Sequence, residues 1–191
     1  MDLVLASTSR YRRALLERLG VPFRWLAPRV DEEAIKRAEL EPRELAEQLA
    51  LAKATSLCDT EPEATLIGSD QLVVHEGRAF GKPVSVEGAV AQLTAMAGKT
   101  HELVTALCVW HRGRTVTHTD LTRLHMRPLS RAEIERYVAA DRPFDCAGGY
   151  KLEERGIALF ESIESQDHTA ITGLPLIALT TILRGLGYAI P

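Results

Sequence analysis

Short apolar runs alternate along this chain with segments of helical periodicity, and this alternation restricts the fold more than any other feature. Leu3–Ala6 predicts a short buried strand, and residues 10–19 predict the helix that follows it. Thr65–Gly68 predicts another buried strand, which ends at Ser69-Asp70. Strands and helices interspersed in this way are typical of α/β folds, in which helices cover the faces of a sheet.

Two hairpins interrupt the alternation. Glu76-Gly77 and Arg112-Gly113-Arg114 each separate two strand candidates, as hairpin turns do. Further strands are expected over Phe23–Leu26, Leu72–His75, Arg78–Phe80, His101–His111, Thr115–Met126 and Ile157–Ile163, and further helices over 42–57, Ser85–Ala97, 130–140 and Leu174–Leu186. We therefore expect one domain over residues 1–191, an α/β fold with a mixed β-sheet flanked by helices.

Charge and composition exclude several classes of function. The 191 residues carry a formal net charge of -3, so the broad positive field of a nucleic-acid-binding protein is absent, and phosphate binding would need a local cluster. The three cysteines form no CxxC pair, which is typical of a reduced cytoplasmic protein. No apolar stretch approaches the ~20 residues of a membrane-spanning helix. We expect a cytoplasmic protein without a membrane or nucleic-acid partner.

Hydroxyl and guanidinium groups gather where the first strand candidate passes into a helix. Ser7 and Ser9 stand at this junction, and Arg12 and Arg13 follow in the first helical turn. A helix start has unpaired N–H groups and a partial positive charge, and arginine matches the geometry of phosphate oxygens. The stretch therefore predicts a polyphosphate site. The alternative is that a serine only caps the helix while the arginines are solvated.

Carboxylates and lysines elsewhere could complete such a site. Asp70 follows a buried strand, where it could bind Mg²⁺ or accept a proton from water, although it could also be a turn or cap residue. Lys53 lies on an apolar helix face, so it either extends to solvent or contacts a phosphate. Lys82 precedes a proline, and Lys151 follows Gly148-Gly149 in a loop.

These residues resemble the Maf family of nucleoside triphosphate pyrophosphatases. The family opens with a strand, the pattern SxSxxRR and a helix, as this chain does. The other markers follow in order, and they are Val30-Asp31-Glu32, Lys53 within AKA, Gly68-Ser69-Asp70, Lys82-Pro83, CAGGYK at Cys146–Lys151, and GLPL at Gly173–Leu176. The resemblance covers essentially the whole chain. It implies an elongated fold similar to inosine triphosphatases, with two lobes around a cleft, and a homodimer.

Three positions resemble the branch of the family that acts on 7-methyl-GTP. They are Tyr11 before the arginine pair, Gln71 in GSDQ, and Glu153 in a K-x-E pattern after the CAG loop. The aromatic residue in that branch is often tryptophan, so Tyr11 is a departure. An aromatic face attracts the cationic ring of 7-methylguanine, and a carboxylate accepts guanine N–H groups. Tyr11 also lies on the apolar helix stripe, which leaves core packing as its alternative.

The resemblance implies hydrolysis of the α–β phosphate bond, giving a nucleoside monophosphate and pyrophosphate. It implies that Asp70 is the base for the attacking water and that Glu32 and Asp70 hold Mg²⁺ or Mn²⁺. The phosphate-binding residues would be Ser7, Ser9, Arg12, Arg13, Lys53, Lys82 and Lys151. Three alternatives remain: a pyrophosphatase of the same family for dTTP or UTP, a nucleotide-binding regulator of cell division, and an α/β domain with no phosphate chemistry.

Overall fold

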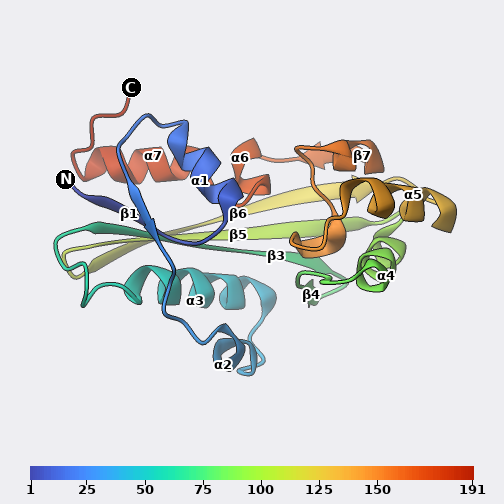
Figure 1. Ribbon diagram of the computed structural model, residues 1–191, viewed down its shortest axis with the longest axis horizontal. Helices are drawn as coiled ribbons and strands as arrows, with labels where there is room; N and C mark the ends of the chain where they lie inside the picture. The colour runs from blue at the N-terminus through green and yellow to red at the C-terminus, as the bar shows by residue number, and fades with distance from the viewer. The chain divides into compact units, whose positions relative to one another are not determined.

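The computed structural model describes residues 1–191 and contains a seven-stranded sheet with helices on its faces (Figure 1). The strands are β1 Leu3–Ala6, β2 Arg24–Leu26, β3 Thr65–His75, β4 Arg78–Phe80, β5 Thr100–His111, β6 Arg114–Met126 and β7 Phe160–Glu164. The helices are α1 Arg10–Glu17, α2 Glu32–Lys36, α3 Pro42–Thr55, α4 Val86–Met96, α5 Arg131–Asp141, α6 His168–Ile171 and α7 Leu176–Gly185. Two short 3₁₀ turns cover Ala147–Gly149 and Arg155–Leu159.

The strand order confirms the predicted mixed sheet. It runs β2-β1-β3-β5-β6-β7, and β4 pairs with β3. β1 is parallel to both β2 and β3, whereas β4 and β7 pair antiparallel with their neighbours. No helix of the structure combines the length and apolar character that crossing a membrane requires.

The chain divides into two compact units. The first contains residues 1–70, 105–120 and 167–191, and the second contains residues 71–104 and 121–166. The expectation of one domain over residues 1–191 stays a prediction.

The first unit has a helical layer on each face of its strands. In Figure 1, α1 and α7 lie on one side of β1 and α3 on the other. Side chains alternate along β1 accordingly: Leu3 and Leu5 pack in the cluster that contains α1 and α7, and Val4 and Ala6 pack in the cluster at the end of α3. This alternation explains why a four-residue strand is apolar at every position.

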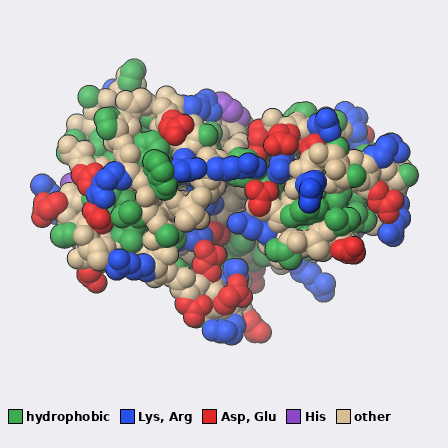
Figure 2. Space-filling view, in the orientation of Figure 1, with side chains coloured by type: hydrophobic (Ala, Val, Ile, Leu, Met, Phe, Trp, Pro, Cys, Tyr) green, Lys and Arg blue, Asp and Glu red, His purple; other side chains and the backbone are tan.

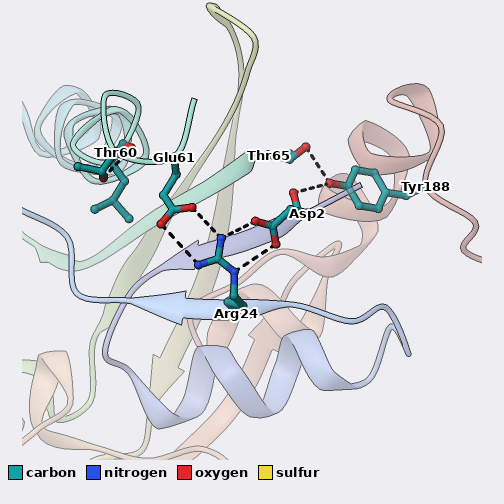
Figure 3. A network of polar contacts seen from close by, with 7 residues as sticks. Asp2, Arg24, Thr60, Glu61, Thr65 and Tyr188 are labelled. Atoms are coloured by element: carbon teal, nitrogen blue, oxygen red, sulfur yellow. Dashed lines mark hydrogen bonds and ion pairs between the residues drawn. The ribbon is translucent and has the colours of Figure 1, made fainter. Parts of the chain in front are cut away.

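A polar network ties the ends of this unit together (Figure 3). The Arg24 guanidinium pairs with the carboxylates of Asp2 and Glu61, the latter at 2.7 Å. The Tyr188 hydroxyl contacts the Asp2 carbonyl at 3.1 Å and the Thr65 hydroxyl at 2.8 Å. The segment after α7 is therefore fixed to the start of β1 and β3.

Gly68 lets β3 approach α3 more closely than any other residue would. A Cβ atom placed on Gly68 would lie 2.3 Å from the Ala50 carbonyl oxygen and 2.4 Å from the Ala54 nitrogen. Backbone atoms cannot move aside at little cost. We therefore expect Gly68→Ala to lower the free energy of unfolding by about 2–4 kcal/mol. Denaturant unfolding of Gly68→Ala checks this, with Gly81→Ala as the control, because a Cβ on Gly81 would meet no atom within 4 Å.

The second unit encloses a buried histidine. His101 is 2% exposed, and its ring lies 5.5 Å from that of Tyr150 and 5.8 Å from that of Phe160. Burial, together with the charge of the nearby His75, lowers the pKa of His101 to about 4. The imidazole is therefore neutral in the folded protein at pH values where it would be protonated in the unfolded chain.

This depressed pKa predicts acid sensitivity. Below pH 6.5 the unfolded chain binds a proton that the folded protein does not, so stability falls as the pH is lowered towards 4. A shift from 6.5 to about 4 corresponds to about 3 kcal/mol in total. Urea unfolding at pH 7 and pH 4.5 measures the loss, and the loss should be smaller in His101→Phe. An equal loss in both proteins would contradict the assignment.

Four local expectations need correction. β3 does not end at Ser69-Asp70 but continues to His75, so Asp70 lies inside a strand. The strand predicted from Ile157 begins only at Phe160, after a 3₁₀ turn. The loop predicted at Gly148-Gly149 forms a short 3₁₀ turn. The helices α2 and α6, of five and four residues, were not predicted, because they are shorter than a periodic pattern can reveal.

Candidate active site

The hydroxyl groups after β1 organise the turn into α1. The Ser7 hydroxyl accepts the Ser9 N–H at 3.2 Å, and the Ser9 hydroxyl accepts the Arg12 N–H at 3.4 Å. Ser9 is thus the N-cap of α1, as the capping alternative supposed. Ser7 is buried, at 4% exposure. A capped helix start still has N–H groups that can face an anion, so phosphate binding here stays a prediction.

The arginines of this motif point to different partners. Arg12 donates through Nε to the Gly173 carbonyl at 2.9 Å, whereas the Arg13 guanidinium lies 4.7 Å from the centre of the Trp25 ring. Burial lowers the pKa of Arg12, and the negative charges of Asp70 and Glu32 oppose that shift. Arg12 therefore stands in the field of the two predicted metal-binding carboxylates.

Lys53, Asp70 and Glu32 form the centre of the site. The Lys53 ammonium lies 2.6 Å from Asp70 Oδ1 and 3.0 Å from Glu32 Oε1. The side chains of Lys53 and Asp70 are 7% and 11% exposed. Lys53 therefore does not extend to solvent but lies between two carboxylates. A phosphate contact for Lys53 stays a prediction.

The three side chains of this group come from α3, β3 and α2. Lys53 comes from the buried face of α3, and Asp70 follows Gly68, which holds β3 against the same helix. Glu32 begins α2, whose N-cap Asp31 accepts the Ala34 N–H at 3.0 Å. Acidic and basic side chains are mixed over α2 on the molecular surface (Figure 2).

The charges of this group keep Glu32 ionised. Burial raises the pKa of Glu32, but the nearby Lys53, Lys36 and Arg12 outweigh it, so the pKa lies below its usual value. The lysine and the arginine of this group can bind a polyphosphate. A carboxylate beside them can accept a proton from water.

A divalent cation at this site stays a prediction, for which Glu32 and Asp70 are the candidate ligands. Glu32 and Asp70 supply carboxylate oxygens, which Mg²⁺ and Mn²⁺ prefer. No cluster of three or more His, Cys, Asp or Glu side chains that could hold a metal ion is present. Two carboxylates suit an ion that completes its coordination with phosphate oxygens and water, rather than one held by the protein alone.

The Gly173 carbonyl is a part of the site that sequence reasoning missed. It accepts hydrogen bonds from Arg12 Nε and from the Ser69 hydroxyl, both at 2.9 Å. Gly173 has a φ of +108°, and a Cβ there would lie 3.5 Å from Arg12 Nε. The GLPL pattern that contains Gly173 was the available signal, but a backbone acceptor has no residue type that reveals it.

The predicted residues that lie in the second unit are Gln71, Lys82, Lys151 and Glu153. Lys82 and Glu153 are exposed, and Gln71 follows Asp70 along β3. The Lys151 ammonium donates to the Asp141 carbonyl at 3.0 Å. The structure thus brings together Arg12, Glu32, Lys53 and Asp70. The binding roles of the other predicted residues stay predictions.

Comparisons with known proteins agree with the sequence motifs. A 7-methyl-GTP pyrophosphatase of Bdellovibrio bacteriovorus is 54% identical over 183 residues, or 96% of each chain. A protein with the same description from Xanthomonas axonopodis pv. citri is 47% identical, over 99% of this chain and 98% of its own. Another, from Syntrophotalea carbinolica, is 44% identical, over 97% of this chain and 94% of its own.

A solved structure and a family model also match this chain. A structure described as a HAM1 protein from Coxiella burnetii covers 97% of this chain and 99% of its own, at 14% identity and a TM-score of 0.48, too weak a likeness to add to the assignment. The model of the family described as Maf-like protein matches residues 2–186. With that match, and with relatives this similar over nearly the full length, the chain belongs to the Maf family.

Proposed function

We propose that this protein is a nucleoside triphosphate pyrophosphatase that hydrolyses the α–β phosphate bond of 7-methyl-GTP. The products would be 7-methyl-GMP and pyrophosphate, and the reaction would remove a modified nucleotide. One observation carries the chemistry: the Lys53 ammonium lies between the Asp70 and Glu32 carboxylates, in the field of Arg12. The substrate is supported by the description that the relatives share.

In this reaction Asp70 transfers a proton, and the cationic residues of the site neutralise phosphate charge. The water oxygen forms a bond to the α-phosphorus, the bond from that phosphorus to the bridging oxygen breaks, and Asp70 takes the proton of the water. Arg12 and Lys53 neutralise the charge that develops on the phosphate oxygens, with Ser7, Ser9, Arg13, Lys82 and Lys151 as the further predicted contacts. Mg²⁺ or Mn²⁺ held by Glu32 and Asp70 would supply additional charge neutralisation.

Base recognition would rest on Tyr11, Gln71 and Glu153. The Arg10 guanidinium already lies over the Tyr11 ring at 4.7 Å, which supports the ability of this ring to hold a cation. A methylated guanine is such a cation. Glu153 is exposed and therefore open to the N–H groups of a base.

Pyrophosphate release from a nucleotide panel tests the function. The panel is 7-methyl-GTP, GTP, dTTP, UTP and CTP, each with Mg²⁺ and then with Mn²⁺. We expect the highest kcat/KM for 7-methyl-GTP. A preference for dTTP or UTP would place the protein in the other branch, and binding of nucleotide without turnover would favour the regulator of cell division.

We also propose, from the family resemblance, a cytoplasmic homodimer. Sedimentation equilibrium tests the assembly, because a dimer has twice the 21.1 kDa of one chain. A single species at the mass of one chain, over micromolar concentrations, would contradict it.

A further inference from the structure

Lys151 is the centre of a tightly bonded turn in the second unit. The residue is 7% exposed, and its N–H donates to the Tyr137 hydroxyl at 2.9 Å. Its carbonyl accepts N–H groups from Glu154 and Gly156, at 3.2 and 3.0 Å. Its ammonium donates to the Asp141 carbonyl at 3.0 Å, at the end of α5. The backbone N–H, the carbonyl and the ammonium of Lys151 therefore each have a partner within the turn or in α5.

The last turn of α5 provides the partners for both ends of this turn. Tyr137 and Asp141 are four residues apart and so share one face of the helix, and both are buried. Asp141 accepts the Arg155 N–H at 3.1 Å, and its carboxylate lies 3.8 Å from the Arg155 guanidinium. Tyr137 thus binds the first residue of the turn, and Asp141 binds the fifth.

The neighbouring residues leave the turn little freedom. The Tyr150 hydroxyl contacts His101 Nε2 at 2.9 Å, and its ring packs 5.0 Å from that of Phe160. A Cβ on Gly156 would lie 2.3 Å from the Lys151 carbonyl oxygen. The segment from Tyr150 to Gly156 is therefore anchored by side chains on one end and by close backbone packing on the other.

Glu153 lies between these anchors and is exposed. An exposed carboxylate on a loose turn must be ordered when it binds a base, and that ordering costs conformational entropy. A turn that is already fixed avoids most of this cost for the backbone. Residues that fix such a turn act on the ligand through Glu153, and they do not touch the ligand themselves.

We propose that Tyr137 and Asp141 are positioning residues for base selection, because they fix the Lys151–Gly156 turn and with it the place of Glu153. The inference rests on the proposed function, since Glu153 selects the base only if the substrate is a nucleotide. Its structural half, the fixation of the turn by α5, can be measured without any substrate.

Tyr137→Phe is the direct test, because it removes only the hydroxyl that accepts the Lys151 N–H. We expect KM for 7-methyl-GTP to rise about tenfold, kcat to change less than about twofold, and the preference over GTP to fall. Tyr188→Phe is the matched control: Tyr188 is also buried, at 6% exposure, and its hydroxyl is also hydrogen-bonded. The control should leave the preference unchanged.

Amide hydrogen exchange gives the second readout. In Tyr137→Phe the Lys151 N–H should lose protection, while amides of α4 keep theirs. Asp141→Asn, which retains an acceptor for the Arg155 N–H, should change both readouts in the same direction but less. Asp141→Asn also replaces Tyr137→Phe as the test if Tyr137→Phe folds poorly.

The outcomes separate this inference from the function on which it rests. If the wild type does not prefer 7-methyl-GTP, the proposed substrate fails, and exchange at Lys151 still decides whether α5 fixes the turn. Unchanged protection at Lys151 would overturn the inference. So would an equal loss of kcat for every nucleotide, because that is the signature of a purely structural defect.

Discussion

Replacing Asp70 by asparagine is expected to lower kcat for pyrophosphate release by a factor of about 10²–10⁴, the usual contribution of a general base. The amide has nearly the same shape as the carboxylate and can still accept a hydrogen bond from Lys53, which lies at 2.6 Å. It cannot take a proton from water. Initial rates at saturating nucleotide measure the loss, and thermal unfolding shows that the variant is folded.

Asp59→Asn is the matched control for this change. Asp59 is an exposed aspartate in the turn after α3, outside the proposed site. Its asparagine variant should keep the wild-type rate. Wild-type turnover in Asp70→Asn would remove Asp70 from the mechanism and leave the ion-paired group without a catalytic base.

Lys53→Met is expected to reduce both activity and stability. Methionine retains most of the apolar stem, but the Asp70 carboxylate, 11% exposed, loses the ammonium at 2.6 Å. A buried charge left without its partner typically costs about 3–5 kcal/mol of folding free energy. We expect about 3 kcal/mol, because Glu32 is more exposed and remains partly solvated. Urea unfolding at pH 7.5 measures this loss.

A second substitution distinguishes a lost ion pair from lost packing. Adding Asp70→Asn to Lys53→Met removes the unpaired charge, so the double variant should regain much of the lost stability. A double variant as unstable as the sum of its parts would contradict the ion-pair account. Lys36→Met, at an exposed ion pair, is the control.

Elements with local signals were predicted well from the sequence. The helix predicted over 130–140 begins with a capping box, in which Ser130 and Glu133 bind each other's backbone N–H groups. The hairpin between β5 and β6 turns at Arg112-Gly113, where both residues have a positive φ. In both cases the residues that determine the structure are neighbours in the chain.

β3 shows why other parts could not be predicted. A run of Ser69, Asp70 and Gln71 is typical of a strand end, since buried polar groups need partners. Ser69 finds its partner in the Gly173 carbonyl, 104 residues away, and Asp70 finds it in Lys53, 17 residues away. Partners that only the folded chain brings together leave no local pattern.

The side-chain directions in the site could not be predicted either, because their partners are distant in the sequence. The motif showed that Arg12 and Arg13 belong together, but the backbone sends one towards Gly173 and the other onto Trp25. Lys53 had two interpretations from its helix face, and its burial between two carboxylates removed the solvent-directed one. Neither direction could be read from residue types alone.

The measurement that tests the account most directly is ³¹P NMR of the products formed from 7-methyl-GTP by the wild-type protein with Mg²⁺. The account predicts pyrophosphate and 7-methyl-GMP in equal amounts, with no orthophosphate released. Orthophosphate together with 7-methyl-GDP would show cleavage at the β–γ bond, and it would contradict the proposed reaction.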